Sequence, residues 1–235
     1  MEREGFVEQY CTGTSRGDLL EQLADLITTV KRPHPVRVGV DGISAAGKTT
    51  LADELIEPIE RRGHPVIRAS VDSFHRPRSE RYRRGVDSPV GYYLDSFDYD
   101  ALCTKLLIPL GPGGSRSYRT RVFDSYTDSP IDAPQHNAPE NAVLLVDGVF
   151  LFRPELNFHW DFRIFVHIDF EEAIRRACER DLSLLGSVEA IRDRYYKKYF
   201  PGERMYLDSV RPAELADVIV ENSVPELPLV VVCNR

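Results

Sequence analysis

The sequence predicts a three-layer α/β fold, in which a mostly parallel sheet is flanked by helices. The first observation is an apolar run, Val36-Arg-Val-Gly-Val40, that leads into a glycine-rich turn and then into a helical pattern from Lys48 to Arg62. The second is that short apolar runs alternate with helical segments through much of the remaining chain. Such alternation is typical of βαβ units, which build parallel sheets.

The segment before the first strand predicts one amphipathic helix. Asp18 can cap a helix from Leu19 to Lys31, along which leucine and isoleucine recur on one face. Pro33 and Pro35 end it. We expect this helix to pack outside the core domain, and a helix that binds a partner is the alternative.

The turn after the first strand matches the phosphate-binding pattern G-x-x-x-x-G-K-[ST] in full. Its glycines allow backbone N–H groups to approach a polyphosphate closely. Lys48 brings a positive charge to the β- and γ-phosphates, and the Thr49 hydroxyl can ligate Mg²⁺. A glycine-rich surface turn is the alternative, which the flanking strand and helix argue against. The residues predicted to bind a nucleotide are Gly42, Ser44, Ala45, Ala46, Gly47, Lys48, Thr49 and Thr50.

A second predicted strand, from Val66 to Val71, ends at Asp72. The resulting strand–helix–strand unit predicts two parallel strands side by side, with ligands beyond their carboxyl ends. If the two strands are neighbours, Asp72 faces the γ-phosphate and can accept the proton of an attacking hydroxyl. A helix cap or a turn residue is the alternative role for this acid.

Residues 74–140 interrupt the alternation with arginine-rich, aromatic and proline-rich stretches. The alternating pattern from Tyr118 to Phe123 predicts a strand or a hairpin. A long, irregular insertion in a compact domain usually has a function, such as a lid or a substrate-binding lobe. The many aromatic residues argue against a disordered linker.

The core resumes with an apolar strand from Ala142 that ends at Asp147 and Gly148. Asp147 is suited to be a second anchor for a magnesium shell, and a turn former or helix cap is the alternative. The later elements are predicted as a strand at 162–168, helices at 170–185 and 188–199, and closing strands at 218–220 and 229–232.

The helix at 170–185 carries Arg175, Arg176 and Arg180 on successive turns. A helical lid with arginines can place positive charge over a γ-phosphate as its bonds loosen. The alternative is a solvated basic face whose arginines pair with neighbouring glutamates, namely Glu171, Glu172 and Glu179.

Composition and charge exclude several classes of protein. The net charge of −7 argues against a general nucleic-acid binder. The four cysteines are scattered without metal-ligand spacing, and no apolar run approaches membrane-spanning length. We therefore expect a cytoplasmic enzyme with no nucleic-acid or membrane partner, and self-association into a homo-oligomer is left open.

In order along the chain, these residues resemble the uridine kinase and phosphoribulokinase-like family of P-loop kinases, from about residue 36 to 222. Besides the phosphate loop, the resemblance rests on Asp72-Ser-Phe-His75, Ser96-Phe97-Asp98, Val146-Asp147-Gly148, Arg175-Arg176 with Arg180-Asp181, Arg211-Pro212 and Ala216-Asp217. It implies a P-loop NTPase fold in a single domain, with 36–73 and 141–235 as core, 74–140 as substrate-binding insertion and 1–35 as N-terminal helical extension.

The resemblance also implies ATP-dependent phosphorylation of a small-molecule hydroxyl, commonly the 5′-OH of a nucleoside. The implied catalytic residues are Asp72, Lys48, Arg176 and Arg180, with ATP and Mg²⁺ as cofactors and Thr49 and Asp147 at the metal. Asp98 is implied to contact the sugar diol, since a carboxylate can accept from both hydroxyls. The remaining implied substrate-binding residues are Phe74, His75, Tyr93, Phe97 and Phe123, and filling the lobe's own core is the alternative for the aromatic rings.

The chain departs from the family's pattern at three places. Phe123 and Asp128 stand where pyrimidine-specific members carry a tyrosine and a histidine that read the base. The lid tail, residues 184–187, lacks the family's arginines, and His75 replaces a tyrosine. Sugars, nicotinamide riboside and pantothenate-like compounds therefore remain alternative acceptors. An NTP-driven switch protein is the alternative to a kinase. The sequence also leaves open whether GTP can replace ATP.

Overall fold

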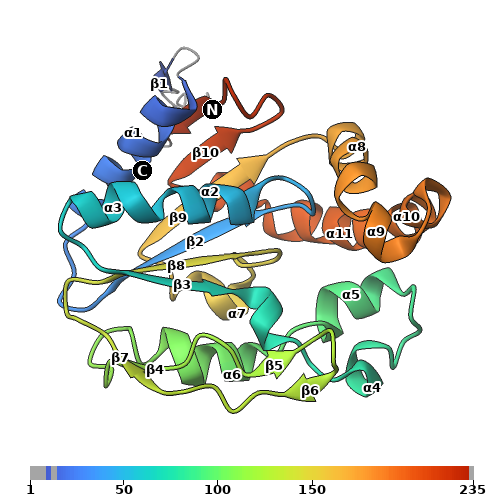
Figure 1. Cartoon of the computed structure of the whole chain (residues 1–235), viewed down its shortest axis with the longest axis horizontal. Coiled ribbons are helices and arrows are strands. Elements are labelled where there is room, and N and C mark those ends of the chain that lie inside the picture. Colours follow the sequence, from blue (N-terminus) through green and yellow to red (C-terminus); the bar gives the residue numbers. More distant parts are fainter. Residues whose placement is uncertain (1–8, 12–14, 233–235) are drawn as a thin grey trace, which may run out of the picture.

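The computed structural model describes residues 9–11 and 15–232, and these form a central sheet covered by helices (Figure 1). The seven-stranded sheet has the order β1-β11-β10-β9-β2-β8-β3. Its strands from β10 to β3 pair in parallel, whereas β11 is antiparallel to both of its neighbours. The predicted α/β class is thereby confirmed. The strands are β1 (Gln9–Cys11), β2 (Val36–Gly42), β3 (Val66–Ser70), β8 (Val143–Gly148), β9 (Phe162–His167), β10 (Val218–Glu221) and β11 (Leu229–Val232).

The prediction that the first two core strands are neighbours is wrong, because β8 lies between β2 and β3 and pairs with both. Every residue of β8 is buried, as expected for a strand covered on both faces. The carboxyl ends of the three strands still meet, since Asp41 pairs with Gly148 and Ser70 with Asp147. Asp72 therefore lies at the same edge of the sheet as the phosphate loop, with the end of β8 between them.

Alternate residues of β8 belong to two separate hydrophobic clusters, one on each face of the sheet. Val143 and Leu145 pack with α1 (Arg16–Thr29), α2 (Lys48–Glu54) and α3 (Ile56–Arg61). Leu144 and Val146 pack with the opposite layer. That layer includes α6 (Tyr99–Leu102), the wide turn η2 (Cys103–Leu107), α7 (Pro154–Asn157) and α12 (Pro212–Leu215). This alternation produces the three layers.

Two predicted helix boundaries need correction. The cap of α1 is Ser15, whose hydroxyl oxygen accepts from the backbone N–H of Asp18 at 3.2 Å, and the helix ends before Lys31. The helix predicted from Lys48 to Arg62 is divided into α2 and α3 at Leu55. Pro58 explains the division, because proline has no N–H for the carbonyl four residues earlier.

The insertion at 74–140 forms a lobe along one side of the sheet (Figure 1). Two short strand pairs replace the single strand or hairpin predicted from Tyr118 to Phe123, so that prediction is wrong in extent. The lobe begins at the 3₁₀ turn η1 (Val71–Phe74), and its elements besides α6 and η2 are α4 (Arg78–Arg81), α5 (Pro89–Asp95), β4 (Ser117–Tyr118), β5 (Phe123–Asp124), β6 (Ser129–Pro130) and β7 (His136–Asn137).

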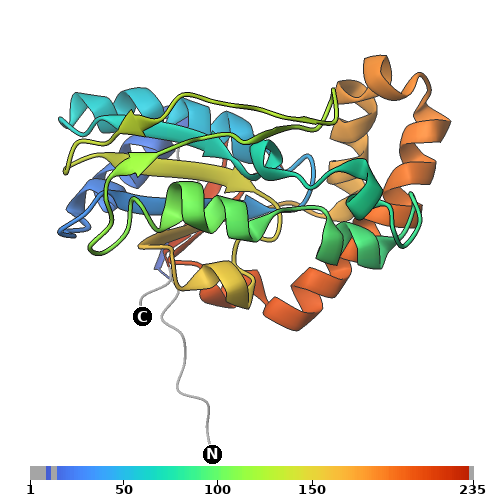
Figure 2. The same ribbon diagram turned by 90° about the horizontal axis from the view of Figure 1, so that it is seen from below.

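Residues 170–199 form a helical arm at the same end of the molecule as α4 and α5 (Figures 1 and 2). The predicted helix at 170–185 is divided at Asp181 into α8 (Phe170–Arg180) and α9 (Leu182–Leu185). The next helix, α10 (Val188–Arg194), continues through a π-helical turn, η3 (Tyr195–Tyr199), into α11 (Phe200–Val210). The arm is thereby continuous with α11, which contributes Phe200 to one hydrophobic cluster and Tyr206 to the other. Among the described helices, none has the length and apolar character needed to cross a membrane.

Substitution of Leu145 by alanine tests the central position of β8. Leu145 is fully buried, so we expect the free energy of unfolding to fall by about 2–5 kcal/mol through lost burial and a residual cavity. Urea denaturation measures the change. The exposed Leu227 provides a matched control, and Leu227→Ala should change stability by less than about 0.5 kcal/mol. Equal effects of the two substitutions would contradict the burial of β8.

Candidate active site

The phosphate loop joins the end of β2 to the start of α2, and its backbone needs glycine at two points. Gly42 has a positive φ of 155°, and a Cβ there would lie 2.4 Å from the carbonyl oxygen of Val166 in β9. Gly47 has a φ of 92° and caps α2. Ala45 also adopts a left-handed conformation, with a φ of 63°. The loop is therefore held in one unusual shape by the strand beside it.

Lys48 lies beneath this loop with only 8% of its surface exposed. Its Nζ donates to the carbonyl oxygen of Ile43 at 2.6 Å. Burial lowers the pKa of Lys48, while the nearby carboxylates of Glu203, Asp41 and Asp147 act in the opposite direction. The ammonium is thus placed at the loop and surrounded by acids.

Asp147, at the end of β8, accepts a hydrogen bond from the Thr49 hydroxyl through Oδ2. Its other oxygen, Oδ1, is buried without a hydrogen-bond donor, although Arg68 Nη1 lies 2.8 Å away as an ion pair. A hydroxyl beside a buried carboxylate is a donor set that fits Mg²⁺, with Arg68 as the present partner of Oδ1. The two residues predicted for the metal are therefore brought together.

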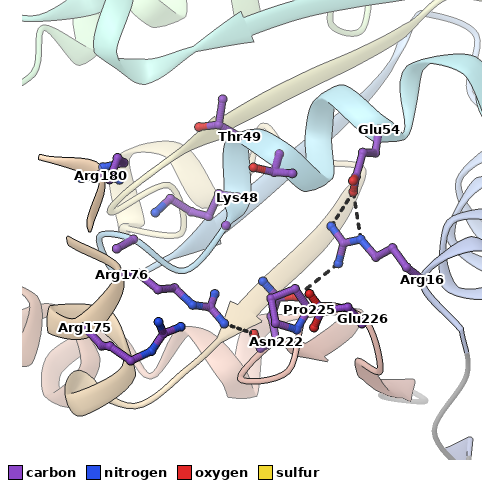
Figure 3. A pocket seen from close by; sticks show the side chains of 13 residues that line it. Arg16, Lys48, Thr49, Glu54, Arg175, Arg176, Arg180, Asn222, Pro225 and Glu226 are labelled. Atoms are coloured by element: carbon purple, nitrogen blue, oxygen red, sulfur yellow. Dashed lines mark hydrogen bonds and ion pairs between the residues drawn. The ribbon is translucent and has the colours of Figure 1, made fainter. Parts of the chain in front are cut away.

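Two cavities meet over the loop. The outer cavity, of about 830 Å³, lies between the loop, α8 and the segment after β10 (Figure 3). The inner cavity, of about 410 Å³, lies between the loop, the insertion and the arm. Both cavities are lined by Ala45, Lys48, Thr49 and Arg180. A group bound at these residues is accessible from either side.

Asp72 lines the inner cavity together with Lys48 and Thr49. It lies in η1 and is exposed, and the cap of this turn is the Ser70 hydroxyl. The carboxylate of Asp72 is thus not used as the cap. This placement agrees with the geometry required of a base that faces a bound phosphate.

His75 and Phe97 form one wall of the inner cavity, with ring centroids 4.7 Å apart. Burial lowers the pKa of His75, although the carboxylate of Asp72 opposes this effect. The lowered pKa favours the neutral imidazole. Its Nδ1 lies 2.8 Å from the backbone oxygen of Asp72, so Nδ1–H donates there and Nε2 is left as an acceptor.

The predicted arginines have three different environments. Arg180 lines both cavities and donates to the hydroxyl of Tyr195 at 3.0 Å. Arg176 lines the outer cavity and donates to the backbone oxygen of Asn222 at 2.6 Å. Arg175 also lines the outer cavity and forms ion pairs with glutamates of its own helix. Arg176 pairs with one of them, Glu172, so the alternative of a paired basic face holds for both.

Four residues predicted to bind substrate do not line either cavity. Phe74 is buried in the hydrophobic cluster that the lobe shares with the sheet, and Phe123 is buried outside both clusters, so both rings fill the interior. The ring of Tyr93 packs under the guanidinium of Arg153, 4.5 Å from its centroid. Asp98 caps α6 by accepting from the N–H of Ala101 at 2.9 Å.

Sequence reasoning missed Glu203 of α11, which is 1% exposed beside the phosphate loop. Its Oε1 accepts from the backbone N–H of Ser44 at 2.8 Å and from the Tyr92 hydroxyl at 3.4 Å. Its Oε2 is buried without a hydrogen-bond partner, and burial raises the pKa of Glu203. Nothing local in the sequence marks this glutamate, because its partners lie more than 100 residues away.

A second missed acid is Asp41, which is fully buried in β2. Its carboxylate accepts from the Tyr206 hydroxyl of α11 and from the N–H of Gly42. Burial raises the pKa of Asp41 to about 6, although these two hydrogen bonds act to lower it. An acid inside an otherwise apolar strand, directly before the first glycine of the loop, is the signal that could have identified it.

Comparisons with known proteins agree with this arrangement. A family model described as the Phosphoribulokinase / Uridine kinase family matches residues 37–226. Uridine-cytidine kinase B of Dictyostelium discoideum is 32% identical over 197 residues, covering 80% of this chain and 74% of that protein. The uridine kinase of Chloroflexus aggregans (strain MD-66 / DSM 9485) is 31% identical over 194 residues, covering 79% and 86%.

Solved structures show the same fold. A protein from Bacillus stearothermophilus, described as a possible uridine kinase, superposes with a TM-score of 0.68 and 22% identity. The superposition covers 86% of this chain and 97% of that protein. At this identity the likeness concerns the fold alone.

Substitutions of Glu203 test its contact with the phosphate loop. Glu203→Ala leaves the half-buried Ser44 N–H without its acceptor, so the free energy of unfolding should fall by about 1 kcal/mol. Glu203→Gln keeps a carbonyl oxygen at the same place and should be affected less. Chemical denaturation of both variants measures the difference, and equal losses would contradict a role for this hydrogen bond.

The same variants predict a pH dependence. A carboxyl group whose pKa is raised by folding stabilises the protein below its unfolded pKa, near 4.5, and loses this contribution as the pH rises through the folded pKa. The wild-type protein should therefore lose stability relative to Glu203→Gln as the pH increases above 4.5.

Proposed function

Because the chain belongs to the Phosphoribulokinase / Uridine kinase family, we propose that it transfers the γ-phosphate of ATP to a hydroxyl group of a nucleoside. One observation carries the proposal: two cavities meet at Lys48, Thr49 and Arg180. A donor in the outer cavity and an acceptor in the inner cavity would share these residues at the transferred phosphate. The relatives named uridine kinases support a nucleoside as acceptor.

In this proposal the donor's phosphates lie along the backbone N–H groups of the loop, with the nucleoside in the outer cavity. Lys48 stabilises negative charge on the transferred group. Arg180 belongs to the arm and lines both cavities, so it can neutralise charge that develops during transfer. Arg176 binds the donor from α8.

Asp72 is the proposed base. It accepts the proton of the attacking hydroxyl while the new O–P bond forms and the bond to the leaving ADP oxygen breaks. Lys48, Thr49 and Asp72 line the same inner cavity, so a hydroxyl held there lies between the carboxylate and the phosphate loop.

Thr49 and Asp147 would hold Mg²⁺ through the hydroxyl and the buried carboxylate, whose Oδ1 pairs with Arg68 in the structure. When bound, the ion supplies positive charge to the phosphate oxygens.

For the acceptor, the inner cavity offers the His75 and Phe97 rings, which are tilted by 48° to each other, and the hydroxyl of Tyr92. His75 Nε2 can accept a hydrogen bond from a base or a sugar. The insertion therefore forms the acceptor wall in this proposal. Asp98 would contact the ribose diol only if its cap on α6 opens.

A panel of acceptors tests the proposed reaction. We expect uridine, cytidine or another nucleoside to stimulate ADP release from ATP and to yield the 5′-monophosphate, identified by mass spectrometry. Pentoses, nicotinamide riboside and pantothenate serve as the comparison set, and GTP is tested as donor in parallel. If no nucleoside raises turnover above the rate without an acceptor, the proposal fails.

The variant Asp72→Asn tests the base. Turnover should fall by about 10²–10⁴-fold, the usual contribution of general-base catalysis, while ATP affinity persists. Asp100→Asn is the control, because Asp100 is also exposed but lines neither cavity. Unchanged turnover of Asp72→Asn would remove this residue from the mechanism.

A further inference from the structure

Arg16, the first residue of α1, extends into the outer cavity from outside the segment that the family model matches (Figure 3). Its Nε and Nη2 donate to one carboxylate oxygen of Glu54 in α2, at 2.8 and 2.6 Å. Its Nη1 donates to Oδ1 of Asn222 at 3.2 Å. One guanidinium thus joins the N-terminal helix to two walls of the cavity.

Asn222, which follows β10, is 3% exposed and lies between Arg16 and the phosphate loop. Its Nδ2 donates to the carbonyl oxygen of Ala46 at 2.7 Å, and its own backbone oxygen accepts from Arg176. An asparagine amide has one accepting and one donating end. Because Arg16 can only donate and the Ala46 carbonyl can only accept, the two partners fix which way the amide points.

The amide of Asn222 also packs directly against the backbone of the loop. A Cβ added at Gly47 would lie 2.6 Å from Nδ2 of Asn222. The loop backbone and the amide are therefore in close contact at the residue before Lys48. A change in the amide's orientation would be transmitted directly to the backbone groups proposed to bind phosphate.

We propose that Arg16 is a positioning residue for the donor nucleotide, which acts by holding the Asn222 amide against the phosphate loop. The N-terminal helix is then part of the nucleotide site, and this inference rests on the proposed function of the loop. Without Arg16, Oδ1 of Asn222 loses its donor, and only the hydrogen bond to the Ala46 carbonyl still holds the amide in place. The loop is then less well shaped for phosphate before the nucleotide binds.

Attachment of α1 does not depend on Arg16 alone. Leu19, Leu23 and Ile27 are fully buried against the core. Arg62 of α3 forms ion pairs with Glu21 and Asp25 of α1, at 2.9 and 2.8 Å. The side chains of Arg16 and Arg62 have similar exposure, 19% and 22%. Arg62 is therefore a matched control that joins α1 to the core without contacting Asn222.

The test compares Arg16→Ala with Arg62→Ala in the full chain. We expect Arg16→Ala to weaken the binding of a non-hydrolysable ATP analogue about tenfold in calorimetry without acceptor, since a buried acceptor loses its donor. The KM for ATP should rise similarly, with kcat changed less than about twofold, because the lost interaction contributes equally before and during transfer. Arg62→Ala should lower thermal stability comparably and leave ATP affinity unchanged.

A double substitution separates positioning from general destabilisation. Adding Arg16→Ala to Asn222→Ala should weaken nucleotide binding no further than Asn222→Ala alone, because the two residues act through one contact. Arg16→Lys keeps the charge but replaces the planar fork of the guanidinium with a single nitrogen. It should bind ATP with intermediate affinity, and it carries the test if the alanine variant does not fold.

Three results would overturn the inference: wild-type affinity in Arg16→Ala, equal weakening by Arg62→Ala, or additive losses in the double variant. Failure of the wild-type protein to bind the ATP analogue would instead contradict the proposed function. Binding is measured without an acceptor, so the identity of the acceptor does not affect the outcome.

Discussion

The buried ammonium of Lys48 is the constraint on which the site depends. A lysine with 8% exposure is removed from water, and it remains charged only if negative groups surround it. Asp41, Asp147 and Glu203 supply that charge from β2, β8 and α11. The acids in turn are stabilised by donors from the loop and from neighbouring helices, so the cation and its surroundings form one interdependent network.

This network explains why distant segments converge on the loop. Val166 of β9 leaves no space for a side chain at Gly42, while Glu203 binds the N–H of Ser44 and Asn222 binds the carbonyl of Ala46. The loop is therefore held on three sides by elements that follow it by more than 100 residues. The helical arm is connected to the phosphate site because it continues into α11. The N-terminal helix α1 is connected to it because Arg16 contacts Asn222.

Local patterns in the sequence were sufficient for the parts that depend on neighbouring residues. The loop, the buried strands and the acids at strand ends were predictable, and Asp72 and Asp147 lie at the same edge as Lys48. The position of β8 between β2 and β3 was not predictable, because strand order depends on packing across the whole sheet. Glu203 and Arg16 were missed for the same reason, since each has meaning only through partners distant in sequence.

The aromatic residues predicted to bind substrate show that burial decides which role such a residue has. Of the rings proposed for the substrate, Phe97 and His75 reach the inner cavity, whereas Phe74 and Phe123 are buried in the interior. The lobe must bury apolar surface against the sheet, and aromatic residues serve that need as readily as they bind a ligand.

The positive charge of the arm also comes from other residues than the family's pattern indicates. Residues 184–187 lack arginine, but Arg180 and Arg194 both line the inner cavity. Positive charge is therefore supplied to the acceptor side from the ends of α8 and α10, and the tail between them contributes leucines.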